Sequence, residues 1–386
     1  MCESTSVSII DSTLREGEQT PGTAFDNRQK RKIIHLLAEL GVDEIELGVA
    51  APCFSGLPAF VQEARQDVGG RSRLALWCRC RAADIAFAAA CSPDVLSLSI
   101  PVSDLHIHHK LRCSRNKVLE MLGPSIRMAV DSGIPFVSVG LEDATRTDND
   151  FLAEVVIQAE AAGAFRVRLA DTVGVATPGT ISDLVRMVRS HCSGPIGVHT
   201  HNDFGMATAN AVAALEAGAR WADATVLGLG ERAGNCRLEE LVGYLALIRG
   251  GSRYSPQRLP ALCGLVAEAA DIEILRNHPV VGRDVFTCET GLHLHGLSVN
   301  PKTYEPFDPE RIGRSRTLRF GGKTGKRAVR NSLSSMGVDI SDQAAAKVVS
   351  RLRQMAREGK NALNATELLN LVGGKDDIAM NICRPS

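Results

Sequence analysis

Short apolar segments that alternate with amphipathic helical patterns fill the first two-thirds of the chain. Eight of these segments have the length and composition of buried β-strands. Eight strands joined by helices, with no Gly-x-Gly-x-x-Gly after the first, favour an α/β protein built on a closed (β/α)8 TIM barrel over an open Rossmann sheet. The predicted strands are Val7–Ile10, Glu44–Leu47, Leu74–Trp77, Val95–Ile100, Phe136–Val139, Arg166–Leu169, Ile196–Val198 and Ala224–Val226.

A break at Gly250-Gly251-Ser252 marks the predicted end of the barrel. We therefore expect a catalytic barrel over residues 1–250, a linker and first C-terminal subdomain over 251–325, and a mainly helical subdomain over 326–386. Glycines follow several of the predicted helices, as is common at helix ends. The predicted helices include Asn27–Leu40, Asp150–Ala162, Pro178–Ser190, Asn210–Ala217, Leu262–Ile274, Arg330–Met336, Gln343–Glu358 and Ala365–Val372.

The charge balance and the cysteines exclude several classes of protein. The 386 residues carry 44 basic and 44 acidic side chains, so we expect neither nucleic acid nor an anionic membrane as a partner. No apolar run is long enough to span a membrane and no secretory signal begins the chain, which predicts a cytoplasmic protein. The 11 cysteines form no C-x-x-C pair and are expected to be reduced thiols rather than a zinc ribbon.

Two histidines two residues apart end the seventh predicted strand, in the stretch Ile196–Asp203. Because side chains alternate across a strand, His199 and His201 leave the same face and could hold one metal ion. A pair of hydrogen-bonded histidines is the simpler alternative. The first strand runs into the polar stretch Asp11–Gln19, and one of its carboxylates would complete a two-histidine, one-carboxylate site with open positions.

Polar side chains follow most of the other predicted strands, at the barrel end that carries chemistry in this fold. A glycine-rich loop, Gly228–Asn235, follows the eighth strand. Such loops bind phosphates on backbone amides, but this one could equally be a tight turn into the next helix. The other strand-end candidates are Arg15, Glu16, Gln19, Glu46, Arg79, Arg81, Glu142, Asp143, Asp171 and Thr172.

Three motifs resemble one enzyme family. They are D-S-T-L-R-E-G-E-Q from Asp11, V-H-T-H-N-D-F-G from Val198 and G-L-G-E-R-A-G-N from Gly228. They resemble the Claisen-condensing synthases, which include isopropylmalate, citramalate and homocitrate synthases and share a barrel with metal-dependent acyl-CoA lyases. The resemblance implies an acyltransferase that joins acetyl-CoA to a 2-oxo acid.

The resemblance also implies roles for individual residues. A divalent metal ion (Mg, Mn or Zn) would be bound by Glu16, His199 and His201, with Asn235 as a further ligand. The substrate pocket would be lined by Gln19, Glu46, Arg81 and Thr172, and acetyl-CoA would be bound at Gly228, Gly230 and Gly234. Catalysis would use Arg15, facing the ketone, with Glu142, His293 and Tyr304.

The last two of these would reach the active site from the neighbouring subunit of a homodimer. Three alternatives stay open. Glu142 could be a carboxylate at a helix start, His293 a surface loop histidine, and Tyr304 a packed tyrosine.

The substrate that the resemblance implies is a 2-oxo dicarboxylic acid, 2-oxoglutarate. Ser99–Leu111 and Val139–Arg146 resemble homocitrate synthases of nitrogen-fixing bacteria, whose product becomes a ligand of the nitrogenase iron–molybdenum cofactor. Ser138 stands where lysine-pathway homocitrate synthases have arginine, so another cation must face the second carboxylate. Arg79 and Arg81 are candidates, and Arg81 is favoured.

Some residues depart from the family pattern, and other functions stay open. Cys288, His295 and Gly322-Lys323 are the departures, all beyond the barrel. A synthase for another 2-oxo acid, such as citramalate or isopropylmalate synthase, is the nearest alternative. An acyl-CoA lyase and a non-catalytic homologue are further alternatives.

Overall fold

The computed structural model describes residues 7–250, 253–289, 293, 296–297 and 299–373. The chain divides into two compact units, Met1–Ile274 and Leu275–Ser386. The first unit therefore continues beyond the sequence break at Gly250, through helix α10 (Leu259–Ala269). In the described part of the chain, no helix is long and apolar enough to cross a membrane. His295, one of the departures from the family pattern, lies outside the described residues.

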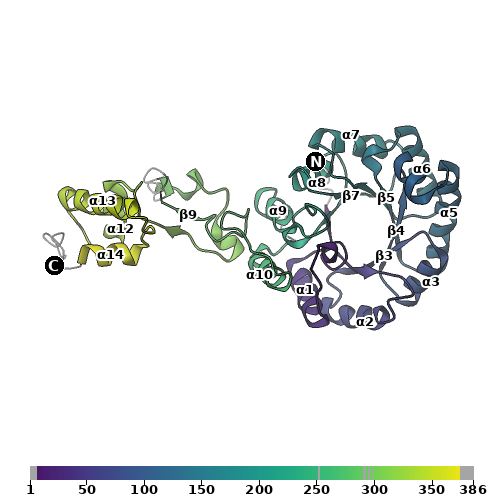
Figure 1. Cartoon of the computed structure of the whole chain (residues 1–386), viewed down its shortest axis with the longest axis horizontal. Coiled ribbons are helices and arrows are strands. Elements are labelled where there is room, and N and C mark those ends of the chain that lie inside the picture. Colours follow the sequence, from purple (N-terminus) through teal and green to yellow (C-terminus); the bar gives the residue numbers. More distant parts are fainter. Residues whose placement is uncertain (1–6, 251–252, 290–292, 294–295, 298, 374–386) are drawn as a thin grey trace. The chain divides into compact units, whose positions relative to one another are not determined.

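The first unit is a closed barrel of eight parallel strands that follow one another in chain order, with helices around the outside (Figure 1). The predicted (β/α)8 fold is confirmed. The strands are β1 (Ser8–Asp11), β2 (Glu44–Val49), β3 (Arg73–Arg79), β4 (Val95–Pro101), β5 (Phe136–Glu142), β6 (Arg166–Asp171), β7 (Ile196–Thr200) and β8 (Trp221–Ala224).

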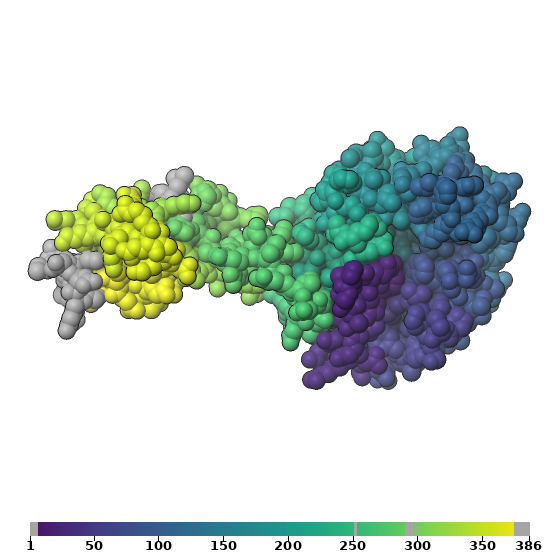
Figure 2. All heavy atoms as spheres, in the orientation of Figure 1, coloured from purple at the N-terminus to yellow at the C-terminus, as the bar shows by residue number. Residues whose placement is uncertain are grey.

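Neighbouring outer helices such as α1 (Asn27–Leu40) and α2 (Leu57–Val68) pack against each other. In the space-filling view, the purple-to-teal residues of the barrel unit form one continuous surface (Figure 2). Helix α1 shows why these segments are helical. Asp26 and Gln29 form a capping box at its start, and Gly41 ends it in the left-handed conformation at φ 93°. The other helices of the unit are α2 (Leu57–Val68), α3 (Ala82–Ala90), α4 (Asp104–His106), α5 (Arg115–Asp131), α6 (Asn149–Ala161), α7 (Pro178–Arg189), α8 (Ala207–Glu216) and α9 (Leu238–Gly243).

Strand β8 begins three residues earlier than the sequence pattern predicts. The apolar run Ala224–Val226 suggested the strand, but the chain leaves the sheet after Ala224 and turns. Leu227 adopts the left-handed conformation at φ 58° in that turn. The strand that pairs with β1 and β7 thus contains Trp221 and Asp223, whose side chains do not give an apolar pattern.

The barrel interior contains buried charge. Arg166 of β6 is completely buried and donates two hydrogen bonds to Glu44 of β2, from Nη2 to Oε1 at 2.7 Å and from Nη1 to Oε2 at 3.1 Å. Its Nε donates to the Ser138 hydroxyl at 3.1 Å, and the guanidinium lies 4.4 Å from the centre of the Trp221 ring. Every arginine nitrogen in this pair has a partner, which is the condition under which a buried ion pair is tolerated.

Among the described residues, the second unit contains a small parallel sheet and a group of helices near the C-terminus. Strands β9 (Thr287–Cys288) and β10 (Thr317–Leu318) pair with each other. Helices α12 (Lys326–Ser335), α13 (Asp342–Arg357) and α14 (Ala365–Gly373) share a hydrophobic core that includes Val329, Leu333, Val348 and Leu352. The three C-terminal helices predicted from sequence are therefore present, each within a few residues of its expected ends.

Removing one partner of the buried pair should destabilise the barrel strongly. Glu44→Gln leaves the Arg166 guanidinium without a counter-charge, and we expect a loss of about 3–5 kcal/mol in the free energy of unfolding. Urea unfolding followed by tryptophan fluorescence measures this, because both tryptophans of the chain, Trp77 and Trp221, lie in barrel strands. The double variant Glu44→Gln/Arg166→Met should recover much of the loss. A single-variant loss below about 1 kcal/mol would contradict this account.

Candidate active site

A cavity of about 270 Å³ lies at the carboxyl ends of the barrel strands. Polar chemistry collects at this end in barrels of this kind. A larger hollow of about 790 Å³ over α1 and α2 contains none of the predicted site residues. Seven of the predicted residues line the smaller cavity: Arg15, Glu16, Gln19, Glu142, Thr172, His199 and His201.

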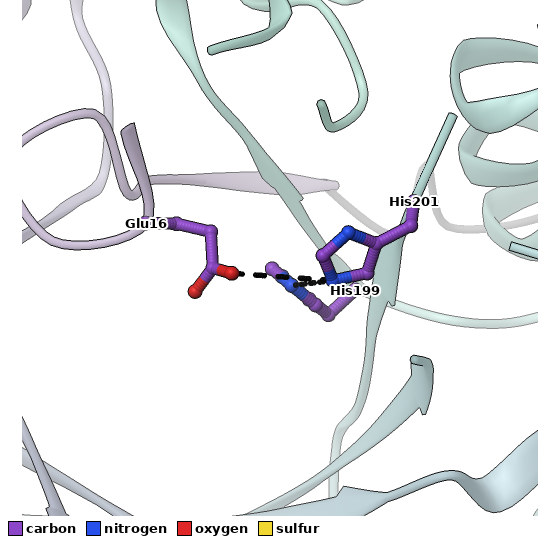
Figure 3. A group of neighbouring side chains, drawn as sticks. All are labelled: Glu16, His199 and His201. Carbon is purple, nitrogen blue, oxygen red and sulfur yellow. Dashed lines mark hydrogen bonds and ion pairs between the residues drawn. The ribbon is translucent and has the colours of Figure 1, made fainter. Parts of the chain in front are cut away.

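Glu16, His199 and His201 converge on one point of this cavity (Figure 3). The two histidine Nε2 atoms are 3.2 Å apart, and Glu16 Oε1 lies 4.0 Å from His201 Nε2. One potential ligand atom from each residue lies within 4.8 Å of the other two. The alternation along β7 brings both rings to the same face, as the sequence predicts. All three residues are buried.

The surroundings of the two histidines suit metal binding. His199 Nδ1 lies 2.9 Å from Asp223 Oδ2, and this hydrogen bond leaves the Nε2 lone pair directed at the site. Burial, and then the neighbouring His199, lower the pKa of His201 to about 3, so its imidazole is neutral near pH 7. The Asn235 amide nitrogen donates to the Leu229 carbonyl at 2.8 Å, while its buried Oδ1 has no partner among the described residues. Two imidazoles, a carboxylate and an amide oxygen fit a divalent cation.

Arg15 is held beside this group by Glu46. Its Nε and Nη2 both donate to Glu46 Oε2, at 2.8 and 2.6 Å, and it also forms an ion pair with Glu16. Burial alone would raise the pKa of Glu46, but Arg15 and Arg168 outweigh it and hold that pKa below its ordinary value. Glu46 is fully buried and does not line the cavity. It orients cations, whereas the sequence had suggested that it lines the pocket.

Glu142 ends β5 and lines the cavity with two basic partners. His106 Nδ1 lies 3.1 Å from Glu142 Oε1, and Lys110 donates to the same oxygen. The following residue, Asp143, takes the left-handed conformation at φ 64°, and its backbone N–H donates to the Thr172 hydroxyl at 2.8 Å. The carboxylate therefore lies at the end of a strand within a hydrogen-bonded cluster, rather than in the first turn of a helix.

Neither arginine at the end of β3 lines the cavity. Arg79 pairs with Asp84 on α3 at 2.7 Å, and half of its side chain is exposed. Arg81 precedes α3 and is exposed. The strand ends at Arg79 and the chain turns outward, so Arg81 is not in the position that its expected contact with substrate requires.

The glycines after β8 are accounted for by the packing of their own loop. Gly228 and Gly234 have φ values of 70° and 84°, in the region that favours glycine. A Cβ on Gly234 would collide with the Gly228 carbonyl oxygen, and one on Gly230 with the Asn235 side chain. This close packing positions Asn235. None of the three glycines lines the cavity, so their expected contact with acetyl-CoA stays a prediction without support from this geometry.

Several residues of the site were not predicted from the sequence. Trp77, Ser99, Lys110, Gly140 and Arg168 also line the cavity. Arg168 of β6 is held by Glu46 at 2.8 Å and by Asp223 at 2.9 Å. Burial alone would lower the pKa of Arg168, but these two carboxylates raise it. The signal was present in the alternation Arg166-Val167-Arg168-Leu169, which places two charges on one face of a barrel strand.

His293 and Tyr304 belong to the second unit, where their rings lie against each other at a tilt. The ring centres are 4.2 Å apart, with an interplanar angle of 37°. Both side chains are exposed. Two residues that the sequence assigns to one catalytic role are therefore neighbours within this unit.

Comparison with known proteins identifies the family. The family model for HMGL-like proteins matches residues 6–266, and the model for the homocitrate synthase post-HMGL domain matches residues 280–360. Homocitrate synthase 1 of Nostoc sp. is 40% identical over 95% of this chain and 97% of its own length. The chain belongs to the isopropylmalate and homocitrate synthase family.

Other members and the solved structures are consistent with this membership. The 2-isopropylmalate synthase 2 of Caldanaerobacter subterraneus is 37% identical over 95% of this chain and 94% of its own length. The crystal structure of HMG-CoA lyase from Brucella melitensis has a TM-score of 0.61 over 69% of this chain and 99% of that chain. At 21% identity, that likeness shows the fold alone. The family is one of metal-dependent acyltransferases that act on 2-oxo acids.

Metal affinity should depend strongly on the proposed ligands and more weakly on Asp223, which holds one of them in place. Glu16→Ala or His201→Ala removes a ligand and should abolish measurable Mn²⁺ binding in isothermal titration calorimetry. Asp223→Ala leaves the ligands in place but frees the His199 ring, and should weaken binding about 10–100-fold. Asp203→Ala is the matched control, because Asp203 follows His201 closely but pairs with Arg232 at 2.9 Å. Mn²⁺ affinity unchanged in Glu16→Ala would contradict the assignment.

Proposed function

We propose that this chain is a homocitrate synthase that condenses acetyl-CoA with 2-oxoglutarate and water to give homocitrate and CoA. The observation that carries the proposal is the convergence of Arg15 with Glu16, His199 and His201 on one cavity. A 2-oxo acid offers a ketone oxygen and a carboxylate oxygen, which together suit an open-sided cation beside an arginine. Matches to a synthase post-barrel domain over residues 280–360 favour a synthase over a lyase.

In the proposed reaction a bond forms between the methyl carbon of acetyl-CoA and the ketone carbon of the 2-oxo acid. The metal, when bound by Glu16, His199 and His201, would polarise the ketone. Arg15 is fixed by Glu46 before substrate arrives, so it can stabilise the negative charge that develops on the ketone oxygen without reorganising. Water then adds to the thioester carbonyl and CoA leaves as the thiol.

The proton steps are assigned to two groups of residues. The methyl carbon must lose a proton before it attacks, and we assign this step to His293 with Tyr304 beside it. Glu142, held by His106 and Lys110, is a proton carrier within the cavity itself. We propose that His293 and Tyr304 act on the barrel of the partner subunit in a homodimer.

The proposed acid substrate is tested by CoA release against a panel of 2-oxo acids. We expect kcat/KM for 2-oxoglutarate to exceed that for pyruvate and 2-oxoisovalerate by at least about tenfold, since a charged contact is worth about 1.5–3 kcal/mol. Mass spectrometry should identify homocitrate as the product. A preference for pyruvate would instead support a citramalate synthase, and a preference for 2-oxoisovalerate an isopropylmalate synthase. These enzymes are the second candidate, because relatives with those names are about as similar in sequence to this chain as the homocitrate synthases are.

A role in nitrogenase cofactor synthesis is the finer part of the proposal. It rests on the resemblance of Ser99–Leu111 and Val139–Arg146 to homocitrate synthases of nitrogen-fixing bacteria. Expression of this chain should restore growth on dinitrogen to a nitrogen-fixing host that lacks its own homocitrate synthase. Growth that returns only when homocitrate is added would reject the role.

Shared active sites predict complementation between inactive variants. Arg15→Ala removes a barrel residue and His293→Ala removes a second-unit residue, so a mixed dimer would keep one complete site. After subunit exchange we expect recovery of up to about a quarter of wild-type CoA release, because half of the dimers are mixed and each has one site. A mixture of Arg15→Ala with Glu16→Ala is the matched control and should not recover, because each change inactivates the barrel of the subunit that carries it and no mixed dimer keeps an intact barrel. Equal activity in the two mixtures would count against shared sites.

A further inference from the structure

Three neighbouring strands place an arginine, a serine and a glycine at one level of the cavity, and the glycine leaves a gap because it has no side chain. Ser99 of β4 pairs in register with Gly140 of β5, and Gly140 pairs with Arg168 of β6. All three line the cavity that also contains Glu16, His199 and His201. No role in the proposed reaction has yet been given to any of them.

The Arg168 guanidinium is fixed at one end and open at the other. Its Nη1 lies 2.8 Å from Glu46 Oε1 and 2.9 Å from Asp223 Oδ2. Its Nε and Nη2 make no hydrogen bond to any residue that the structure describes, and they are not among the buried polar atoms without a partner. Arg168 lines the cavity although the residue as a whole is buried, and these two donors lie on the edge of the guanidinium that binds carboxylates in pairs.

Gly140 leaves this edge uncovered. Its φ is not in the left-handed region, so the backbone does not require glycine there. A Cβ at Gly140 would lie 3.8 Å from both Arg168 Nε and Arg168 Nη2, and 3.5 Å from the Leu98 carbonyl oxygen, which are ordinary contacts. A glycine inside a strand costs stability and often marks a place where a ligand approaches closely. Because Gly140 has no side chain, the space in front of the Arg168 guanidinium edge stays open.

We infer that Arg168, with Ser99 and the gap at Gly140, binds the second carboxylate of a 2-oxo dicarboxylic acid. The inference rests on the proposed function, because it names the acid that the same site takes. Asp223 Oδ2 contacts both Arg168 Nη1 and His199 Nδ1 at 2.9 Å, so the guanidinium lies beside a proposed metal ligand. A diacid held by its 2-oxo acid end at the metal triad has its other carboxylate free for this edge.

The same arrangement discriminates against acids with an apolar end. Such an acid would cover the Arg168 edge and the Ser99 hydroxyl without replacing their water, which is a larger penalty than the absence of one contact. Glu46 and Asp223 keep the guanidinium in place whether or not substrate is bound. Specificity then comes from the Arg168 guanidinium, which is fixed before substrate binds. Arg168 lies on β6, whereas Ser138, which stands where lysine-pathway homocitrate synthases have arginine, lies on β5.

The test compares two five-carbon acids that differ only at the far end, 2-oxoglutarate and 2-oxovalerate. Their affinities are measured by isothermal titration calorimetry on the Mn²⁺-loaded full chain without acetyl-CoA, so no turnover is needed. Wild type should bind 2-oxoglutarate at least about tenfold more tightly, as expected for a charged contact. Gly140→Ala, which fills the gap and keeps both ion pairs of Arg168, should reduce that ratio about tenfold or more.

Arg168→Lys should reduce the ratio as well, because lysine has no paired donor edge. Gly197→Ala is the matched control. A Cβ there would lie 3.5 Å from Cγ of Arg168, on its aliphatic part rather than its donor edge, and Gly197 does not line the cavity. The control should keep the wild-type ratio, and thermal melts verify that all three variants are folded.

The outcomes separate this inference from the proposed function. A wild-type ratio that survives Gly140→Ala and Arg168→Lys shows that another group binds the second carboxylate, which overturns the inference and leaves the synthase proposal standing. Equal weakening of both acids assigns Arg168 to the 2-oxo acid end and also overturns it. If wild type binds neither acid and releases no CoA with any 2-oxo acid, the proposed function fails, and the inference fails with it.

Discussion

The carboxylate of Glu46 is the interaction on which the cavity depends. One of its oxygens accepts hydrogen bonds from Ser12 and Arg15, and the other accepts from Arg168. The acceptor lies on β2, while its partners come from the loop after β1 and from β6 on the other side of the barrel. A single buried anion thus holds two cations on opposite sides of one site, and it can do so only when the barrel is closed.

The interior of this barrel is charged at two levels, and each level has a different purpose. The three nitrogens of the Arg166 guanidinium all donate hydrogen bonds, two to Glu44 and one to Ser138. That level therefore contributes to the fold and, in the described part of the chain, has no free donor for a ligand. Arg168 and Glu46 repeat the pair one step along the same strands, but two donors of Arg168 have no hydrogen-bond partner among the described residues. Inward alternation along β2 and β6 thus places a structural pair and a pair that we propose to bind substrate two residues apart.

Much of this arrangement could be predicted from the sequence because short-range rules fix it. Alternation along a strand brings His199 and His201 to one face, and the capping of α1 sets its ends to the residue. Arg168 was missed because alternating arginines also occur on strands that face solvent, and only closure of the barrel turns them inward. Arg81 was favoured because the resemblance places it where lysine-pathway homocitrate synthases have histidine, but β3 stops at Arg79 and Arg81 lies exposed just before α3. Asp223 was missed because the apolar run after it suggested a later strand.

The shared oxygen of Asp223 has a thermodynamic consequence. It holds both His199, a proposed metal ligand, and Arg168, the proposed partner of the second carboxylate. Metal binding and diacid binding then act on one hydrogen-bonded group, so their free energies are linked and not additive. By reciprocity, whatever factor the cation adds to the affinity for the acid, the acid must add to the affinity for the cation. Because the proposed acid also binds the cation directly through its 2-oxo acid end, the coupling is favourable, and metal retention would rise with the concentration of the acid.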